Sequence, residues 1–420
     1  MAENAVDREE AITETSVSYG RLENILQSSL KTEATFQKCE AKRIGVMQGF
    51  LSRIVQVRIQ WSDQSDKSLP SSVVLKVPSM KNFEEFSEGR EDLKEMVDEE
   101  QSKLMNEQLC RTHNSECSFY RFAAGHEAEL KCPKVYHIEE ASFQEPKSDG
   151  LLVIEDFSDR GYVKSLWDFV ELPLLHDLVS ALAELHAFTL ADRRWLDNKH
   201  SRVADFWNES TPEALQKMKE ATIQSIARFP EHFTERMIER VESMSLEESQ
   251  KSLAFPQTLQ EESGLPSVMA HGDFRVSNVI VDKDDNGDER LVAIIDWQLT
   301  HAGTVVEDLS RFMCMSTSAE TRLEQTTALL EAYHERLVEA TARVGVPTPV
   351  TLEQVKEQYR RLFHSSVLLI GPGMPMMMVS DVVVAGAADP AEAKRVVLAN
   401  AAHLFDELHQ LETQGHPPWQ

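Results

Sequence analysis

The sequence predicts an α+β protein in two parts, residues 1–157 and 158–420, because its hydrophobic periodicity changes along the chain. In the first part, residues 52–61 alternate cleanly between apolar and polar side chains, which is typical of a β-strand. From residue 172 onward the apolar residues mostly recur at helical spacing. These observations predict a sheet-forming first part with a helical insertion, followed by a larger and mainly helical second part.

Short apolar runs and turn signals place the elements of the first part. One helix is predicted at 21–30, and a charged segment of helical periodicity that we cannot assign to any chemistry at 81–111. The predicted strands are 42–44, 52–61, 72–78, 135–138 and 151–154, with a loop at 141–150. Lys76 lies in the third strand between apolar neighbours, so it either reaches out to solvent or points into a cleft with a carboxylate partner.

The second part is predicted to contain six main helices and two notable loops. The helices are 177–190, 212–228, 231–244, 319–344, 351–370 and 391–411. Prolines and glycines predict a loop at 256–266 and another at 371–378. The second loop carries four methionines, which could line a pocket for an apolar substrate or simply fill the core.

Composition narrows the function classes. The 420 residues carry a formal net charge of −27, from 70 acidic and 43 basic side chains, which argues against nucleic acid and anionic membranes as partners. This acidity either steers a cationic substrate or only keeps the protein soluble. The five cysteines have no Cys-x-x-Cys spacing, the N-terminus lacks an apolar core, and 367–379 is interrupted by proline. We therefore expect a cytoplasmic protein without a membrane span, and no feature predicts a protein partner.

The stretch 268–311 carries the strongest chemical signal. His271, Gly272 and Asp273 are followed by Asn278, and an apolar run then leads to Asp296. Two short strands, 279–281 and 291–295, flank a polar turn, so a hairpin returns Asp296 to the neighbourhood of Asn278. Phosphoryl transfer requires a carboxylate that orients the attacking hydroxyl and oxygen ligands that hold Mg²⁺. The three side chains supply both requirements.

The turn of this hairpin also resembles the start of a calcium-binding loop. Asp282, Asp284, Asn286 and Gly287 have the expected spacing, but the twelfth position, which needs a bidentate carboxylate, is Ala293. We therefore reject calcium and interpret the Asn-Gly pair as the hairpin turn.

The segment HGDFRVSN followed by IIDW resembles the aminoglycoside phosphotransferase and choline kinase group, and more closely the ecdysteroid-kinase-like family, also called CHK kinase-like. The family usually has Trp where this chain has Arg275. The resemblance implies a two-lobed protein-kinase-like fold with a small antiparallel-sheet N-lobe and a larger helical C-lobe. It also implies an ATP:alcohol phosphotransferase that uses ATP and Mg²⁺ and acts on a hydroxyl of a small molecule, such as a steroid, a sugar or glycoside, or a choline-like metabolite.

The resemblance assigns roles to individual residues. It implies Asp273 and His271 as catalytic residues, Asn278 and Asp296 as metal ligands, and Asp308 as a structural brace behind the loop. It implies nucleotide contacts by Lys76 with its partner Glu116, by a glycine turn with Gly45, Gly49 and Ser52, and by the hinge residues Glu155 and Phe157. The glycine turn could equally be an ordinary hairpin. The alternative function is a catalytically silent kinase-like protein that binds a ligand or serves as a scaffold.

Overall fold

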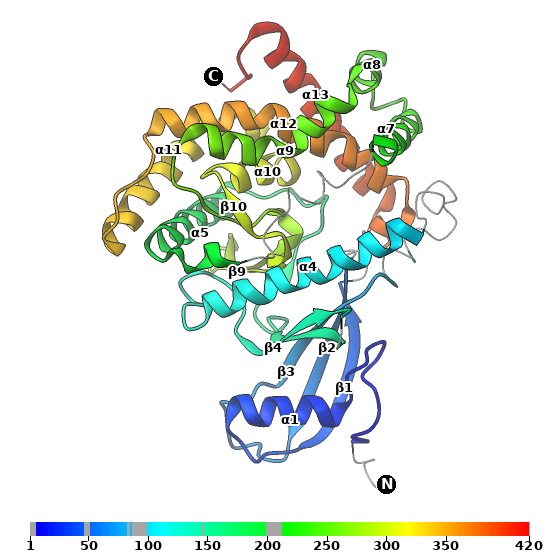
Figure 1. The fold of residues 1–420 in the computed structure, drawn as a ribbon, viewed down its shortest axis with the longest axis vertical. Helices are drawn as coiled ribbons and strands as arrows, with labels where there is room; N and C mark the ends of the chain where they lie inside the picture. Colours follow the sequence, from blue (N-terminus) through cyan, green and yellow to red (C-terminus); the bar gives the residue numbers. More distant parts are fainter. Residues whose placement is uncertain are drawn as a thin grey trace. The chain divides into compact units, whose positions relative to one another are not determined.

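The computed structural model describes residues 6–45, 51–81, 85, 99–144, 147–198 and 212–419. Its internal contacts divide the chain into two compact units (Figure 1). The N-terminal unit consists of Met1–Ala128 and Cys132–Arg160, and the C-terminal unit consists of Glu129–Lys131 and Gly161–Gln420. The first is built on an antiparallel sheet and the second is mainly helical, so the predicted two-part α+β, kinase-like fold class is confirmed.

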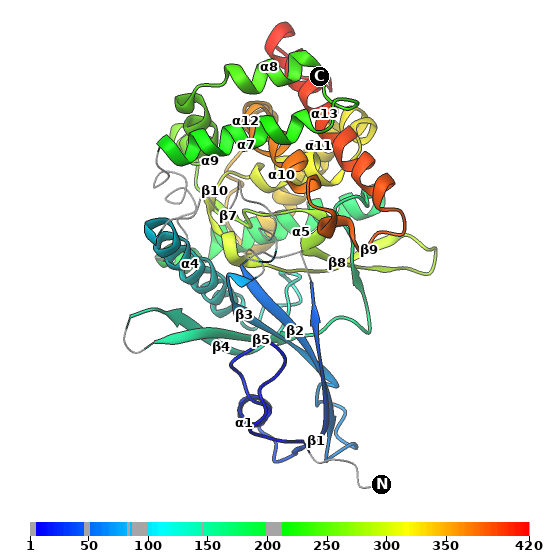
Figure 2. The same ribbon diagram turned by 90° about the vertical axis from the view of Figure 1, so that its right-hand side faces the viewer.

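Within the described residues, the N-terminal unit is a five-stranded antiparallel sheet with two helices. The strands lie in the order β1-β2-β3-β5-β4 (Figure 2). Their bounds are β1 Phe36–Ile44, β2 Ser52–Trp61, β3 Ser72–Pro78, β4 Val135–Ser142 and β5 Ser148–Glu155. The helices are α1 Tyr19–Leu30 and α4 Glu99–Ala123. Every strand that was predicted in this part is present, and each is as long as predicted or longer.

The core of this unit forms where α1 covers the apolar side of the sheet. Leu22 and Leu26 of α1 are fully buried, together with Val55 of β2. Phe36 and Trp61 face each other across the pair of strands, with ring centroids 5.0 Å apart in an edge-to-face arrangement. The period-two alternation of β2 therefore serves to place one row of side chains in this core.

Helix α4 is fastened to β4 by a side-chain amide. Asn114 donates from Nδ2 to the Ala141 carbonyl at 3.0 Å, and its Oδ1 accepts the Ala141 N–H at 2.8 Å. These two bonds pair the backbone N–H and C=O of Ala141 in β4, as a neighbouring strand would. They fix the rotation of α4 and therefore the direction in which Glu116 points.

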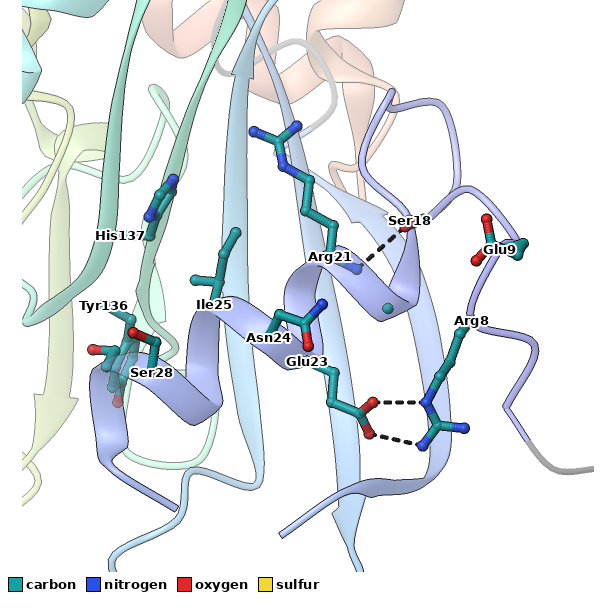
Figure 3. Close-up of a pocket in the computed structure, with 12 residues that line it drawn as sticks. Arg8, Glu9, Ser18, Arg21, Glu23, Asn24, Ile25, Ser28, Tyr136 and His137 are labelled. Atoms are coloured by element: carbon teal, nitrogen blue, oxygen red, sulfur yellow. Dashed lines mark hydrogen bonds and ion pairs between the residues drawn. The ribbon is translucent and has the colours of Figure 1, made fainter. Parts of the chain in front are cut away.

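A hollow of about 810 Å³ lies beside α1 in the N-terminal unit (Figure 3). Both arginines of its lining are paired: Arg8 donates to both oxygens of Glu23, at 2.7 and 3.0 Å, and Arg21 pairs with Glu139. None of the site residues predicted from the sequence lines this hollow.

In its described part, the C-terminal unit combines packed helices with two small sheets, one of order β6-β8-β9 and one that pairs β10 with β7. The strands are β6 Tyr162–Val163, β7 Val268–Ala270, β8 Val279–Lys283, β9 Glu289–Ile294 and β10 His301–Gly303. The α-helices are α5 Leu172–Ala191, α7 Pro212–Ala227, α8 Glu235–Ser243, α9 Leu246–Ser263, α10 Glu307–Ser316, α11 Ala319–Val344, α12 Leu352–Met378 and α13 Pro390–Gln414. Short 3₁₀ turns are η1 Arg193–Asp197, η2 Val276–Asn278, η3 Trp297–Leu299 and η4 Asp381–Val384.

Two predicted loops are wrong, because prolines and glycines there lie inside helices. Residues 256–263 continue α9, with Pro256 in its interior, and residues 371–378 form the last turns of α12, with Pro372 and Pro375 inside. A proline removes one helical hydrogen bond, but burial of the flanking side chains can offset that loss. Met374 and Met378 are buried against α13, so these two methionines fill the core.

Helix α5 is the most apolar of the helices that are described in the C-terminal unit. Among the described residues it alone is long and apolar enough to cross a bilayer by length and composition, with a mean hydropathy of 1.2. Within that window 61% of the residues are buried inside the protein. His186 on this helix meets Tyr333 of α11, with Nδ1 2.7 Å from the hydroxyl. These contacts are those of a core helix in a globular unit.

Candidate active site

The hairpin of β8 and β9 brings Asn278 and Asp296 together as predicted from the strand and turn signals. Val279 pairs with Ile294, and the Ile295 N–H donates to the Asn278 carbonyl at 2.9 Å. Asp296 follows directly. Its backbone is left-handed, with φ 67° and ψ 55°, a conformation that is uncommon for a residue with a side chain and that is often found at functional sites.

Asp273 is held by one oxygen of its carboxylate. Oδ2 accepts from Arg275 Nε at 3.0 Å and from Asn278 Nδ2 at 3.1 Å. No residue that the structure describes donates a hydrogen bond to Oδ1, and the side chain keeps 18% of its surface exposed. The carboxylate is therefore oriented through Oδ2 and presents Oδ1 to an incoming group.

Arg275 is the main charge beside this carboxylate. Its guanidinium is mostly buried, and it also contacts the Ser277 hydroxyl. Burial opposes ionisation of Asp273, but the positive charges of Arg275 and Arg311 outweigh burial and lower the pKa of Asp273. Asp273 is thus kept ionised and able to accept a proton.

The backbone of the loop is braced from α10. Asp308, at the start of this helix, accepts the N–H groups of His271 at 2.7 Å and Gly272 at 3.0 Å. Gly272 has φ +84°, and a Cβ at this position would lie 2.3 Å from the Leu299 carbonyl oxygen. Only glycine combines that conformation with so close an approach. Asp308 and Gly272 together set the direction in which Asp273 leaves the loop.

His271 supports the loop from a fully buried position. It is fully buried, its Nε2 lies 2.9 Å from the Ile295 carbonyl, and its Nδ1 accepts the Asp273 N–H at 3.2 Å. Both ring nitrogens are therefore engaged with backbone groups. In the structure the ring supports the backbone of the loop, and the catalytic role of His271 stays a prediction.

Asn278 and Asp296 have the chemistry to hold a divalent cation. Nδ2 of Asn278 donates to the backbone carbonyl oxygen of Asp273, at 2.8 Å, and to Oδ2 of the same residue. The amide oxygen of Asn278 therefore points the other way. Among the described residues, no cluster of three or more His, Cys, Asp or Glu side chains could hold a metal by itself. Mg²⁺ is commonly bound by one or two protein oxygens together with substrate phosphates, which this pair of side chains fits.

In the N-terminal unit, Lys76 and Glu116 form the ion pair that the sequence suggested. Lys76 Nζ on β3 lies 2.5 Å from Glu116 Oε2 on α4, and the side chains are only 6% and 1% exposed. The outward-pointing alternative for Lys76 is therefore excluded. A buried lysine that is held by a carboxylate keeps a fixed position, as a phosphate contact requires.

The remaining predicted nucleotide residues are only partly described. Gly45 has a left-handed backbone, with φ 61°, and Ser52 begins β2, whereas Gly49 lies outside the described residues. The Glu155 N–H donates to the Lys134 carbonyl at 2.8 Å, and the ring of buried Phe157 lies 4.7 Å from the Arg160 guanidinium carbon. The Glu155 N–H is thus already used within the sheet.

Three charged residues near the loop were not predicted from the sequence. Besides Arg275, these are Arg311 on α10 and the pair His301 and Glu307, whose Nε2 and Oε1 atoms are 2.9 Å apart. Burial opposes charge on His301, but Glu307 raises its pKa to about 9. The sequence signal that could have pointed to this cluster of charges was Arg275 in place of Trp, which puts a cation two residues after Asp273.

Comparison with protein-family models assigns the chain to a family. The model of the family described as "Uncharacterized oxidoreductase dhs-27" matches residues 6–414, and the chain belongs to this family. A Caenorhabditis elegans protein of that name is 23% identical over 343 residues, which are 76% of this chain and 37% of that protein. The "Uncharacterized kinase-like protein D1044.1" of the same organism is 31% identical over 105 residues, 25% of this chain and 26% of that protein. The chain thus spans 37% of the length of the first relative and 26% of the length of the second.

Similar solved structures are small-molecule kinases. An ethanolamine kinase from Plasmodium vivax has a TM-score of 0.44 at 11% identity, covering 86% of this chain and 81% of that chain. The microcompartment-associated aminopropanol kinase has a TM-score of 0.44 at 12% identity, covering 93% and 98%. The predicted kinase-like resemblance is confirmed, whereas the ecdysteroid-kinase-like subtype stays a prediction.

Proposed function

We propose that this protein is an ATP-dependent small-molecule kinase that transfers the γ-phosphate of ATP to a hydroxyl group of a small metabolite. The observation that carries this proposal is the convergence of Asp273, Asn278 and Asp296 through one hairpin and its preceding loop. A free carboxylate oxygen, an outward amide oxygen and a neighbouring carboxylate are the groups that phosphoryl transfer requires.

Asp273 acts on the acceptor in this proposal. Its Oδ1 accepts the hydrogen bond of the acceptor hydroxyl, while Arg275 and Asn278 hold Oδ2 and prevent the carboxylate from rotating. As the acceptor oxygen bonds to the γ-phosphorus, the bond from that phosphorus to the β-phosphate oxygen breaks and ADP leaves. The hydroxyl proton passes to Asp273.

Asn278 and Asp296 would hold Mg²⁺, and Lys76 would contact the nucleotide phosphates. MgATP supplies the phosphoryl group, and its metal offsets the phosphate charge. Glu116 keeps Lys76 extended across the sheet of the N-terminal unit, because the two side chains are buried against each other. Gly45, Ser52 and Phe157 remain proposed nucleotide contacts. These roles rest on the resemblance together with the positions described above.

The test is an assay of a metabolite pool with labelled ATP, read by mass for a phosphate adduct. The wild-type protein should produce an adduct, and Asp296→Asn, which keeps the size of the side chain and tolerates the left-handed backbone, should not. Thermal unfolding of the two proteins provides the control for folding. A labelled product of equal yield from both proteins would contradict the metal assignment.

The same assay separates the enzyme from a catalytically silent kinase-like protein. A silent protein would bind MgATP and give no adduct with any pool fraction. Nucleotide binding alone therefore does not distinguish the two functions, and turnover does. The name of the longer relative, an uncharacterized oxidoreductase, describes a protein of which this chain spans 37%.

A further inference from the structure

We propose that the acceptor carries an anionic group close to its hydroxyl and that the guanidinium of Arg311 binds this group beside Asp273. This inference rests on the proposed kinase function and names the class of its acceptor. It distinguishes this chain from kinases whose hydroxyl acceptor also carries an amine group.

Arg311 lies on the face of α10 that meets the loop. It follows Asp308 by three positions and Glu307 by four, and side chains at these spacings share one side of a helix. Asp308 is the residue that binds the backbone N–H groups of His271 and Gly272. Helix geometry therefore directs Arg311 toward the loop that carries Asp273.

The guanidinium of Arg311 acts electrostatically on this loop and has no described hydrogen-bond or ion-pair partner. It contributes to the low pKa of Asp273 and acts on Glu307 as well. Yet within the part of the chain that the structure describes, Arg311 forms no hydrogen bond and no ion pair, and it is half-buried. An arginine keeps its charge at all physiological pH values, so its N–H donors require acceptors from solvent or a ligand.

Each of three nearby carboxylates already has a partner at one or both oxygens, although Glu307 Oε2 and Asp273 Oδ1 accept no hydrogen bond from the described residues. Glu307 pairs with His301 at 2.9 Å, Asp308 accepts two backbone N–H groups, and Asp273 is paired with Arg275. A carboxylate or phosphate on the acceptor would give Arg311 the planar, two-point partner that a guanidinium binds best.

A cationic acceptor fits this surrounding poorly. An ammonium group would lie close to two guanidinium groups, Arg275 and Arg311, and each would repel it. Recognition of ammonium groups normally uses aromatic rings and uncommitted carboxylates. The net charge of −27 belongs to the whole surface and does not describe this position.

The experiment compares three acceptors of equal length that differ in charge: 3-hydroxypropanoate, 3-hydroxypropanamide and 3-aminopropan-1-ol. Phosphorylation by the wild-type protein is measured at saturating MgATP. We expect the acid to be the best acceptor and the amine the poorest. Arg311→Met should lower kcat/KM for the acid by about tenfold to a hundredfold, the range for hydrogen bonds to a charged group, and leave the amide unchanged.

Two further variants sharpen the result. Arg311→Lys keeps the charge without the planar fork, so it should retain part of the preference for the acid. Arg336→Met makes the same change as Arg311→Met on the exposed side of α11, where Arg336 pairs with Glu339, and it should leave all three acceptors unchanged. Thermal unfolding of each variant excludes loss of the fold as the cause.

Three outcomes would overturn the inference. The acid could be no better than the amide for the wild-type protein, or Arg311→Met could lower both equally. The variant could also weaken MgATP binding as strongly as acid turnover, which would assign Arg311 to the nucleotide phosphates. If no acceptor or pool fraction is phosphorylated, the proposed function fails, and calorimetric titration with 3-hydroxypropanoate still decides the inference: equal binding to wild type and Arg311→Met would contradict it.

Discussion

Two acid–base pairs, Lys76 with Glu116 in the N-terminal unit and Arg275 with Asp273 in the C-terminal unit, differ in how far each carboxylate is enclosed. Glu116 is 1% exposed and Lys76 is 6% exposed. Asp273 is 18% exposed and Arg275 is 11% exposed. The first pair is sealed between a strand and a helix, and the second is held at one oxygen only.

Under the proposed function, this difference separates a pair that fixes the position of a cation from a pair that takes part in the reaction. A sealed pair fixes the position of a cation, and removal of either partner leaves a buried charge without compensation. A pair with one free oxygen keeps an ionised carboxylate that can still receive a proton. We therefore expect changes at Glu116 and Lys76 to lower stability, in addition to the loss of the proposed phosphate contact of Lys76, and changes at Asp273 to act mainly on rate.

The largest expected effect is on transfer by Asp273→Asn. The amide keeps the size of the side chain but cannot accept the hydroxyl proton, so phosphate transfer should fall by about a hundredfold to ten-thousandfold while MgATP still binds. Single-turnover phosphorylation and equilibrium MgATP binding, measured on the same protein, check this expectation. Near-normal transfer would mean that the loop is only a turn, and the comparison between the two pairs would collapse.

The next effect is on the sealed pair. Lys76→Met leaves Glu116 buried without its cation, and we expect the free energy of unfolding to fall by about 3–5 kcal/mol. The double variant Lys76→Met with Glu116→Leu removes both charges and should recover most of that loss. Urea unfolding of the three proteins measures the difference. A single variant as stable as the wild type would show that the pair is not sealed.

A smaller effect concerns pH. The pKa of His301 is raised from 6.5 to about 9 by Glu307, against the opposing effect of burial. A raised pKa stabilises the folded state fully below 6.5, and this stabilisation is lost as pH rises toward 9. The loss should be on the order of 3 kcal/mol, at about 1.4 kcal/mol for each step of one in pKa.

Urea unfolding across this pH range tests the His301 prediction. The matched variant His301→Gln lacks the titrating group, so its stability should change less between neutral and alkaline pH. An identical pH dependence in the two proteins would assign the effect to other groups.

The smallest expected effect is on the backbone of Asp296. Because this residue has φ 67°, Asp296→Gly should be more stable than Asp296→Ala by about 1 kcal/mol, although both lack the carboxylate and both should lose turnover. Urea unfolding of these two variants makes the comparison without a change in charge between them. An alanine variant as stable as the glycine variant would show that the left-handed backbone is not strained.

Local signals predicted much of the candidate site. The spacing of Asp273 and Asn278, the alternation of β8 and β9 and the Asn-Gly turn all act over fewer than thirty residues. The pairing of Lys76 with Glu116, which are forty residues apart, came from the resemblance and is present in the structure. The roles of these residues in catalysis and binding stay predictions.

The errors have one physical cause. Proline and glycine predict helix ends because they remove a hydrogen bond or add backbone freedom, and this is a local effect. In α9 and α12 the helices continue through Pro256, Pro372 and Pro375. The energy that decides these segments comes from packing against other helices, which no window of the sequence contains.

The sequence by itself determined the α+β class, the hairpin that joins Asn278 to Asp296, and the charged groups that are present, because periodicity and turn chemistry act between near neighbours. Only the tertiary structure decided which oxygen of Asp273 is held, that His271 is buried behind the loop, and that Arg311 faces the loop without a described partner. The direction of a side chain depends on what packs around it from distant parts of the chain. The chemical groups of the site are therefore determined by the local sequence, and the directions of their side chains are determined by the fold.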